Sequence, residues 1–160
     1  MNKKTRYLTH GALIAAMYVA LTFVANLLGL ASGVIQVRLS EALTILPLFT
    51  PAAVPGLFVG CILANVLTGC AVWDVVFGSI ATLLGAVGTY YFGKKSKYLA
   101  PVFPIVSNMV IVPLVLQYVY GASEAWIFLA VTVGAGEIIS CGVLGLALHR
   151  ILSRTDIFER

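Results

Sequence analysis

Four ionisable side chains stand inside long apolar stretches of this sequence and are its first candidates for chemistry. Arg38 and Glu41 are three residues apart, whereas Asp74 and Glu137 each stand alone among apolar residues. An ionised group within a membrane costs roughly 2.5–3.5 kcal/mol, so it usually has a partner or lines a cavity. The pattern predicts a polar cavity that opens to the outside, with a carboxylate at its floor.

Each of these residues also has a structural interpretation. Residues three apart on a helix share one face, so Arg38 and Glu41 can form an ion pair. Asp74 can cap a helix end. A purely structural role fits Glu137 less well, because no basic residue in the sequence shares its depth and two nearby glycines let a helix or a ligand approach its backbone.

Uncharged side chains extend this candidate binding site. Asn65, Asn108 and Gln117 supply donors and acceptors. An amide in mid-bilayer needs hydrogen-bond partners, which makes Asn108 the hardest of the three to dismiss. Trp73 offers a flat apolar face near the outer edge, although anchoring at the membrane surface is the default role for such an aromatic residue.

Several chemistries are excluded. The segment from Gly88 to Lys95 is one residue short of a phosphate-binding loop and ends an apolar helix, so it is not an ATP site. Cys61, Cys70 and Cys141 lack metal-ligand spacing. No Ser/His/Asp set converges at one depth. We therefore predict no catalytic residues, no metal ligands and no cofactor.

The elements that must position these residues follow from composition. The chain has 160 residues, of which 61% are hydrophobic and 10% charged. That charge cannot cover a soluble domain, whereas a bilayer supplies an apolar solvent. At about 20 residues for each spanning helix, six helices use most of the chain. No separate catalytic, nucleotide-binding or nucleic-acid-binding domain fits in the remainder.

The basic residues predict the topology, because Lys and Arg in short loops stay on the cytoplasmic side. Nine of the ten fall in three clusters, at 3–6, 94–97 and 150–160. All three clusters are cytoplasmic only if an even number of spans separates each cluster from the next. This requires two helices in the apolar stretch 42–73, and the prolines at 47, 51 and 55 supply the break between them. The alternative, five spans with one external terminus, would place a basic cluster on the wrong side.

We therefore expect an all-α integral membrane protein, a single six-helix transmembrane domain over residues 1–160 with both termini cytoplasmic. The expected spans are 8–30, 35–50, 53–70, 72–93, 98–119 and 125–150. Small residues recur at spacing four in the first span, as Ala12, Ala16 and Ala20. Such a ridge either packs inside the bundle or forms an exposed docking face for another membrane protein.

Specific motifs in the chain resemble one known family, the queuosine-precursor transporter family QueT. They are the stretch from Gln36 to Thr44 with the Arg-Leu-Ser-Glu sequence, Pro55-Gly56, the stretch from Gly60 to Asn65, the stretch from Asp74 to Leu83, and Gly136-Glu137. The resemblance covers most of the chain.

The resemblance implies the substrate-binding S component of an energy-coupling factor (ECF) transporter in a bacterial plasma membrane. It implies a transmembrane coupling protein and two cytoplasmic ATPases as partners, with Ala12, Ala16 and Ala20 meeting the coupling protein. The implied ligand is a 7-deazaguanine such as preQ1 or queuine. We expect Glu41, Asp74 and Glu137 to bind its guanine-like edge and its cationic group, with Arg38 orienting Glu41 and Asn108 or Asn65 reading the carbonyl edge.

Two alternative functions remain. The chain can be an S component for another heterocyclic vitamin. It can also be a stand-alone proton-coupled carrier that uses Glu137 as its proton site. Neither alternative makes the chain an enzyme or a nucleic-acid-binding protein.

Overall fold

The computed structural model describes residues 2–31 and 34–155. Every regular element in these two ranges is a helix. In chain order the elements are α1 (Lys3–Leu27), η1 (Leu39–Leu48), α2 (Ala53–Leu67), α3 (Val72–Phe92), α4 (Val102–Tyr118), α5 (Trp126–Glu137), η2 (Ile138–Leu144) and α6 (Gly145–Leu152). The last three form one continuous helix, Trp126–Leu152, so the elements make six helical segments.

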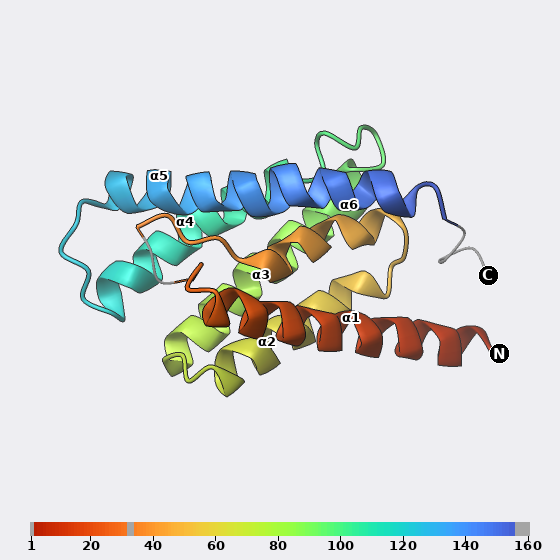
Figure 1. The fold of residues 1–160 in the computed structure, drawn as a ribbon, viewed down its shortest axis with the longest axis horizontal. Coiled ribbons are helices and arrows are strands. Elements are labelled where there is room, and N and C mark those ends of the chain that lie inside the picture. The colour runs from red at the N-terminus through yellow and green to blue at the C-terminus, as the bar shows by residue number, and fades with distance from the viewer. Residues whose placement is uncertain (1, 32–33, 156–160) are drawn as a thin grey trace.

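The segments run along the long axis of the molecule, and the start of α1 and the end of α6 lie at the same end of it (Figure 1). Helix α1 packs against α2, α2 against α3, α3 against α4, and α4 against α5. The short helix η1 contacts α1, α2, α3, η2 and α6. It is therefore the central element of the bundle, although at 10 residues it is much shorter than the surrounding helices α1 and α3.

Among the described residues, three helices are long and apolar enough to cross a membrane: Lys3–Leu27, Val72–Phe92 and Trp126–Leu152. The other three, Leu39–Leu48, Ala53–Leu67 and Val102–Tyr118, are apolar but shorter. Many large apolar side chains on the outside of the bundle are exposed, including Leu27 at 85% and Val72 at 75%. A bilayer accommodates such a surface, whereas water does not.

The second segment differs from the helix expected over 35–50. Its regular part begins at Leu39 and is a 3₁₀ helix, with i to i+3 bonds such as Glu41 N–H to Arg38 O at 3.0 Å. Arg38 is extended (φ −98°, ψ 98°), so Arg38 and Glu41 do not share a helix face. Pro47 lies inside this segment, and its missing N–H weakens any continuous α-helical ladder there.

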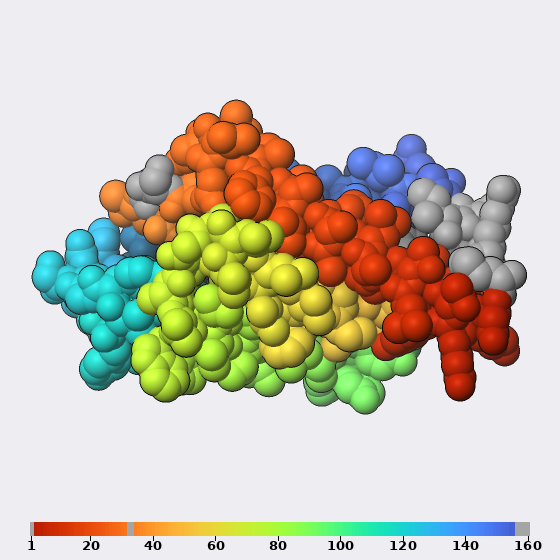
Figure 2. Space-filling model, turned by 90° about the horizontal axis from the view of Figure 1, so that it is seen from below, coloured from red at the N-terminus to blue at the C-terminus, as the bar shows by residue number. Residues whose placement is uncertain are grey.

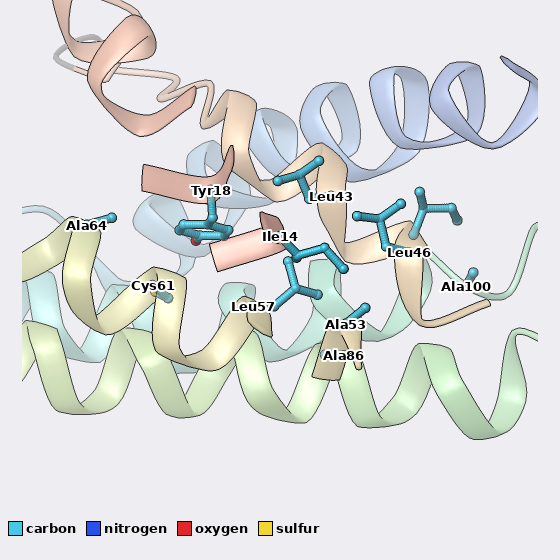
Figure 3. Packing of buried hydrophobic residues seen from close by; sticks show 11 residues of the cluster. Ile14, Tyr18, Leu43, Leu46, Ala53, Leu57, Cys61, Ala64, Ala86 and Ala100 are labelled. Carbon is cyan, nitrogen blue, oxygen red and sulfur yellow. The ribbon is translucent and has the colours of Figure 1, made fainter. Parts of the chain in front are cut away.

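The α1–α2 crossing is close because glycines face each other across it. A Cβ added to Gly56 would lie 2.7 Å from the Gly11 carbonyl oxygen, and one added to Gly60 would lie 2.8 Å from Tyr18 Cβ. The apolar core continues from this crossing to η1 and α3 (Figure 3), through residues such as Leu43 and Leu57. The glycine ridge of α2 thus packs within the bundle.

The alanine ridge of α1 lies on a different face. Ala12, Ala16 and Ala20 are all exposed, while Ala15 between them is 93% buried against α2. Figure 2 shows α1 uncovered along this side of the molecule. Within residues 2–31 and 34–155, the ridge does not pack against another helix.

Candidate functional site

The centre of the candidate site is Glu41, in the first turn of η1, whose side chain is completely buried. The Tyr18 hydroxyl of α1 donates a hydrogen bond to Glu41 Oε1, and the Thr82 hydroxyl of α3 donates to the same oxygen at 3.2 Å. Three helices thus converge on one carboxylate. Because η1 is the central element of the bundle, its first turn holds this carboxylate in the interior.

Glu137 lies beside this group, at the end of α5, and is 4% exposed. The Cys141 thiol, from the π-helical segment η2, donates to Glu137 Oε2 at 3.1 Å and lies 3.5 Å from the Glu41 carbonyl oxygen. The π-helix spacing brings a residue four positions away over the carboxylate, and such segments often occur at functional sites. Glu41, Glu137 and Cys141 present ligand atoms within 4.8 Å of one another.

Two polar atoms in this cluster have no hydrogen-bond partner within the described residues. They are Glu41 Oε2, an acceptor, and Asn108 Nδ2, a donor, neither of which has a partner with full hydrogen-bond geometry; Asn108 is 1% exposed, and its side chain still interacts with the carboxylates of Glu41 and Glu137. Leaving a buried polar atom unpaired costs about 1–3 kcal/mol, and more for a charged group. Such atoms indicate a position where a ligand supplies the missing partners.

Glycine at position 136 shapes the entrance to the cluster. A Cβ there would lie 2.0 Å from the Gln36 carbonyl oxygen, so only glycine lets the extended segment before η1 cross α5. The same segment is fixed by the Arg38 N–H, which donates to Ser140 Oγ at 3.1 Å. Arg38 interacts electrostatically with Glu41, Asp74 and Glu137. No ion pair joins it to Glu41 within residues 2–31 and 34–155.

A cavity of about 750 Å³ lies above the cluster, at the end of the bundle opposite to the start of α1 and the end of α6. Tyr18 and Arg38 line it and also touch or face the buried carboxylates. Its polar wall includes Asn65 and Asp74, and the Tyr120 hydroxyl donates to Asp74 Oδ2 at 2.9 Å. Partial burial raises the pKa of Tyr120 to about 12, so this hydroxyl keeps the proton that it donates.

The eight residues expected from the sequence fall into three groups. Arg38, Asn65 and Asp74 line the cavity, and Glu41, Asn108 and Glu137 are buried. The remaining two lie elsewhere. Trp73 is 59% exposed and stacks on Phe77, and the Gln117 amide donates to the Glu124 carbonyl oxygen at 2.9 Å.

Sequence reasoning missed three side chains of the cluster: Tyr18, Thr82 and Cys141. A tyrosine in the middle of an apolar helix needs a partner for its hydroxyl, so Tyr18 carried a readable signal. Thr82 and Cys141 carried none, because both residue types are common packing residues of membrane helices. Only the fold places them on Glu41 and Glu137.

The charges of the site favour a cationic or donor-rich ligand. Three carboxylates face one guanidinium, that of Arg38. Glu41, Glu137 and Cys141 offer donor atoms that a metal ion or an ammonium group can bind. The positive charge of Arg38, which interacts with Glu41 and Glu137, repels a metal ion bound between these carboxylates. It repels less strongly a ligand whose hydrogen-bond donors are spread over several atoms.

Comparison with known proteins identifies the family. The family model described as QueT transporter matches residues 8–154. A curated protein, "Queuosine precursor transporter QueT" of Lactococcus lactis subsp. cremoris (strain MG1363), is 25% identical over 98% of this chain and 98% of its own length. No solved structure gives a significant match.

Proposed function

The chain belongs to the QueT transporter family, and from this premise we propose that it is the S component of an ECF importer, which binds a queuosine precursor at the outer side of a bacterial plasma membrane. The observation that carries the proposal is the pair of unpartnered atoms, Glu41 Oε2 and Asn108 Nδ2, in a buried cluster beneath an outer cavity. Transporter membership and the apolar helices make it a membrane protein.

The unpartnered atoms complement the edge of a 7-deazaguanine. That edge presents two adjacent N–H donors and one carbonyl acceptor. Glu41 Oε1 already accepts hydrogen bonds from Tyr18 and Thr82, so the unpartnered Oε2 accepts from the donor edge of the ligand, and the Asn108 amide donates to the carbonyl. Burial makes the match selective, since a ligand without these groups leaves both protein atoms unpaired.

A second carboxylate binds the cationic aminomethyl group of preQ1. Asp74 suits this task because it lies in the wall of the cavity and is tied to Tyr120. Glu137 stays beside Glu41 at the floor, with its Oε2 held by Cys141. Arg38 balances part of the negative charge when the site has no ligand.

Six membrane crossings fit the six helical segments, with η1 crossing together with the extended segment that precedes it. Both termini and the 94–97 cluster then lie on the cytoplasmic side. The position of the start of α1 and the end of α6 at one end of the bundle supports this topology (Figure 1). The cavity lies at the other end, which faces the outside.

Transport requires partners. An S component does no covalent chemistry and needs only different ligand affinities in its outward and inward states. The energy comes from two ATPases through a transmembrane coupling protein. The exposed ridge of Ala12, Ala16 and Ala20 supports docking of that protein on α1, since small residues let helices approach closely.

Ligand binding to the purified full chain tests the site. We expect tight binding of preQ1 and of 7-deazaguanine without the aminomethyl group. Glu41→Gln should weaken both ligands, whereas Asp74→Asn should weaken preQ1 alone. Glu124→Gln is the matched control, because Glu124 is an exposed acidic residue that lies outside the cavity lining. Failure of every deazapurine to bind rejects the substrate, and equal affinities in all variants reject the site.

Uptake in cells tests the partners. Labelled preQ1 should accumulate only when the coupling protein and ATPases are present. An Ala16→Leu variant should abolish uptake but keep ligand binding, because the larger side chain blocks the docking ridge without touching the site. Uptake that persists without the ATPases would support the stand-alone carrier instead.

A further inference from the structure

A second cavity, of about 790 Å³, lies at the opposite end of the bundle from the ligand cavity. It is formed between the α3–α4 loop and the end of α6. Its wall includes three cationic side chains, Lys97, Arg150 and Arg154, and the imidazole of His149. None of them takes part in the site described above.

The charges around this cavity are not neutralised within the described residues. The acidic residues of that part of the chain are Glu41, Asp74, Glu124 and Glu137. None of these four lines the cavity. Asp156 and Glu159 lie outside the described residues. The cavity therefore attracts an anion.

The remainder of the lining is apolar or aromatic. Leu146 and Ile151 contribute aliphatic wall, and Ile151 is 63% exposed. Tyr98 also lines the cavity, and the Lys97 amino group lies 5.3 Å from the centre of its ring, within the range of a cation–π contact. This contact holds Lys97 beside the cavity. A free phosphate makes no favourable contact with the apolar part of this wall, whereas the first part of a lipid acyl chain can pack against it.

The position of the cavity also fits a lipid. Arg150 lies in the last turn of α6, at the end of the long apolar helix Trp126–Leu152. Arg154 follows that helix directly. Basic side chains at this depth lie level with lipid headgroups. Basic pockets between the cytoplasmic ends of transmembrane helices bind anionic headgroups in other membrane proteins.

We propose that this cavity binds the phosphate headgroup of one anionic phospholipid. Lys97, Arg150 and Arg154 contact the phosphate, and Leu146 and Ile151 contact the first part of an acyl chain. The lipid joins the α3–α4 loop to the end of α6, two parts of the chain that are far apart in sequence. This site adds to the proposed transport function and does not depend on which substrate the chain carries.

Native mass spectrometry of the purified full chain tests the proposal, with phosphatidylglycerol and phosphatidylcholine as probes. We expect one phosphatidylglycerol to be retained in preference to phosphatidylcholine. Each basic side chain near an anionic surface contributes about fivefold, so K97Q/R150Q/R154Q should weaken retention about 100-fold. The matched control K3Q/K4Q/R6Q removes the same charge from the N-terminal cluster, which lies outside the cavity lining, and should change retention by less than about fivefold.

Further arms separate the other occupants. Excess inorganic phosphate should not displace the lipid, and R150K/R154K should keep most of the retention because it keeps the charge. Thermal unfolding of each variant verifies that it is folded. Equal losses in the two triple variants, displacement by phosphate, or no preference for phosphatidylglycerol would each overturn the proposal. Normal lipid retention by K97Q/R150Q/R154Q together with loss of the coupling protein would assign the face to a protein partner and overturn it as well.

Discussion

The α1–α2 crossing and the Glu41 cluster lie next to each other and use glycine in the same way, but they differ in what they leave unsatisfied. At the crossing, Gly56 and Gly60 let two backbones approach until no space remains. In the cluster, Gly136 lets the segment before η1 pass equally closely, yet Glu41 Oε2 and Asn108 Nδ2 stay without partners. Close packing alone therefore does not indicate a binding site, and the unpaired buried polar atoms are what distinguishes the cluster from the crossing.

The comparison separates stability from binding. The crossing is made of apolar and small side chains, so its packing contacts stabilise the association of α1 with α2. The cluster loses stability because its unpaired atoms have given up water without a replacement. A ligand that supplies the missing hydrogen bonds stabilises the folded state by mass action. Substitutions in the two regions should therefore affect different measurements.

The largest effect is expected for Gly136→Ala. The new methyl group would lie 2.0 Å from the Gln36 carbonyl oxygen, and the extended segment must move because it is less rigid than α5. Overpacking costs about 1–3 kcal/mol. Since the displaced segment carries Arg38, we expect preQ1 affinity to fall by about 100-fold in calorimetric titrations.

Gly142→Ala is the control for this change. Gly142 lies in η2 on the same continuous helix, and the nearest atom to an added Cβ is 3.8 Å away, an ordinary contact. Its affinity should stay close to that of the natural sequence. Equal losses in the two variants would show that the long helix tolerates no substitution in this region. The loss in Gly136→Ala would then not be due to the close approach of Gln36.

Gly56→Ala should give the next largest effect, on stability alone. Its Cβ would lie 2.7 Å from the Gly11 carbonyl oxygen, which forces α1 and α2 apart at a cost of about 1–3 kcal/mol. Thermal unfolding in detergent should show a lower midpoint, while the folded fraction binds preQ1 normally. In Gly11→Ala the nearest contact is 3.4 Å, so this control should melt near the original midpoint. A loss of affinity in Gly56→Ala would contradict the separation of the two regions.

Tyr18→Phe tests the residue that belongs to both regions. Tyr18 Cβ packs at Gly60, and its hydroxyl donates to Glu41. The phenylalanine keeps the packing but removes one of two donors to a buried carboxylate, at a cost of about 1–3 kcal/mol. We expect about a tenfold loss of affinity together with a lower melting midpoint, since the residue serves both regions. Tyr118→Phe, at an 84% exposed position, should change neither measurement.

Much of the helical architecture could be predicted from the sequence, because long uncharged stretches and prolines act locally. The chain breaks between η1 and α2 around Pro51, and Glu137 lies in the middle of the long last helix. The form of the second segment could not be predicted. Apolar periodicity does not distinguish a 3₁₀ helix from an α-helix, and the extension at Arg38 depends on Gly136 and Ser140, about a hundred residues away.

The site was predictable where burial of charge is expensive and unpredictable where a residue type is ambiguous. Glu41, Glu137 and Asn108 stand out because each needs a partner in an apolar environment. Trp73 was a candidate for its flat apolar face and Gln117 for its donors and acceptors, but aromatic and amide side chains near a membrane surface reach water or a loop carbonyl instead. Depth along a helix can be read from sequence, whereas the direction of a side chain depends on neighbouring helices.

Trp73→Leu should give the smallest effect and tests this last distinction. The indole is exposed and stacks on Phe77, and it does not line the cavity. Because its loss removes no contact with a ligand in the cavity, preQ1 affinity should change by less than about twofold, or ~0.4 kcal/mol. Asn65→Ala, at the cavity wall, should weaken binding more in the same titration. If Trp73→Leu weakens binding more than Asn65→Ala does, the start of α3 must turn toward the ligand when it binds. Trp73 would then be an exposed anchor, distinct from the cavity wall, only in the ligand-free state.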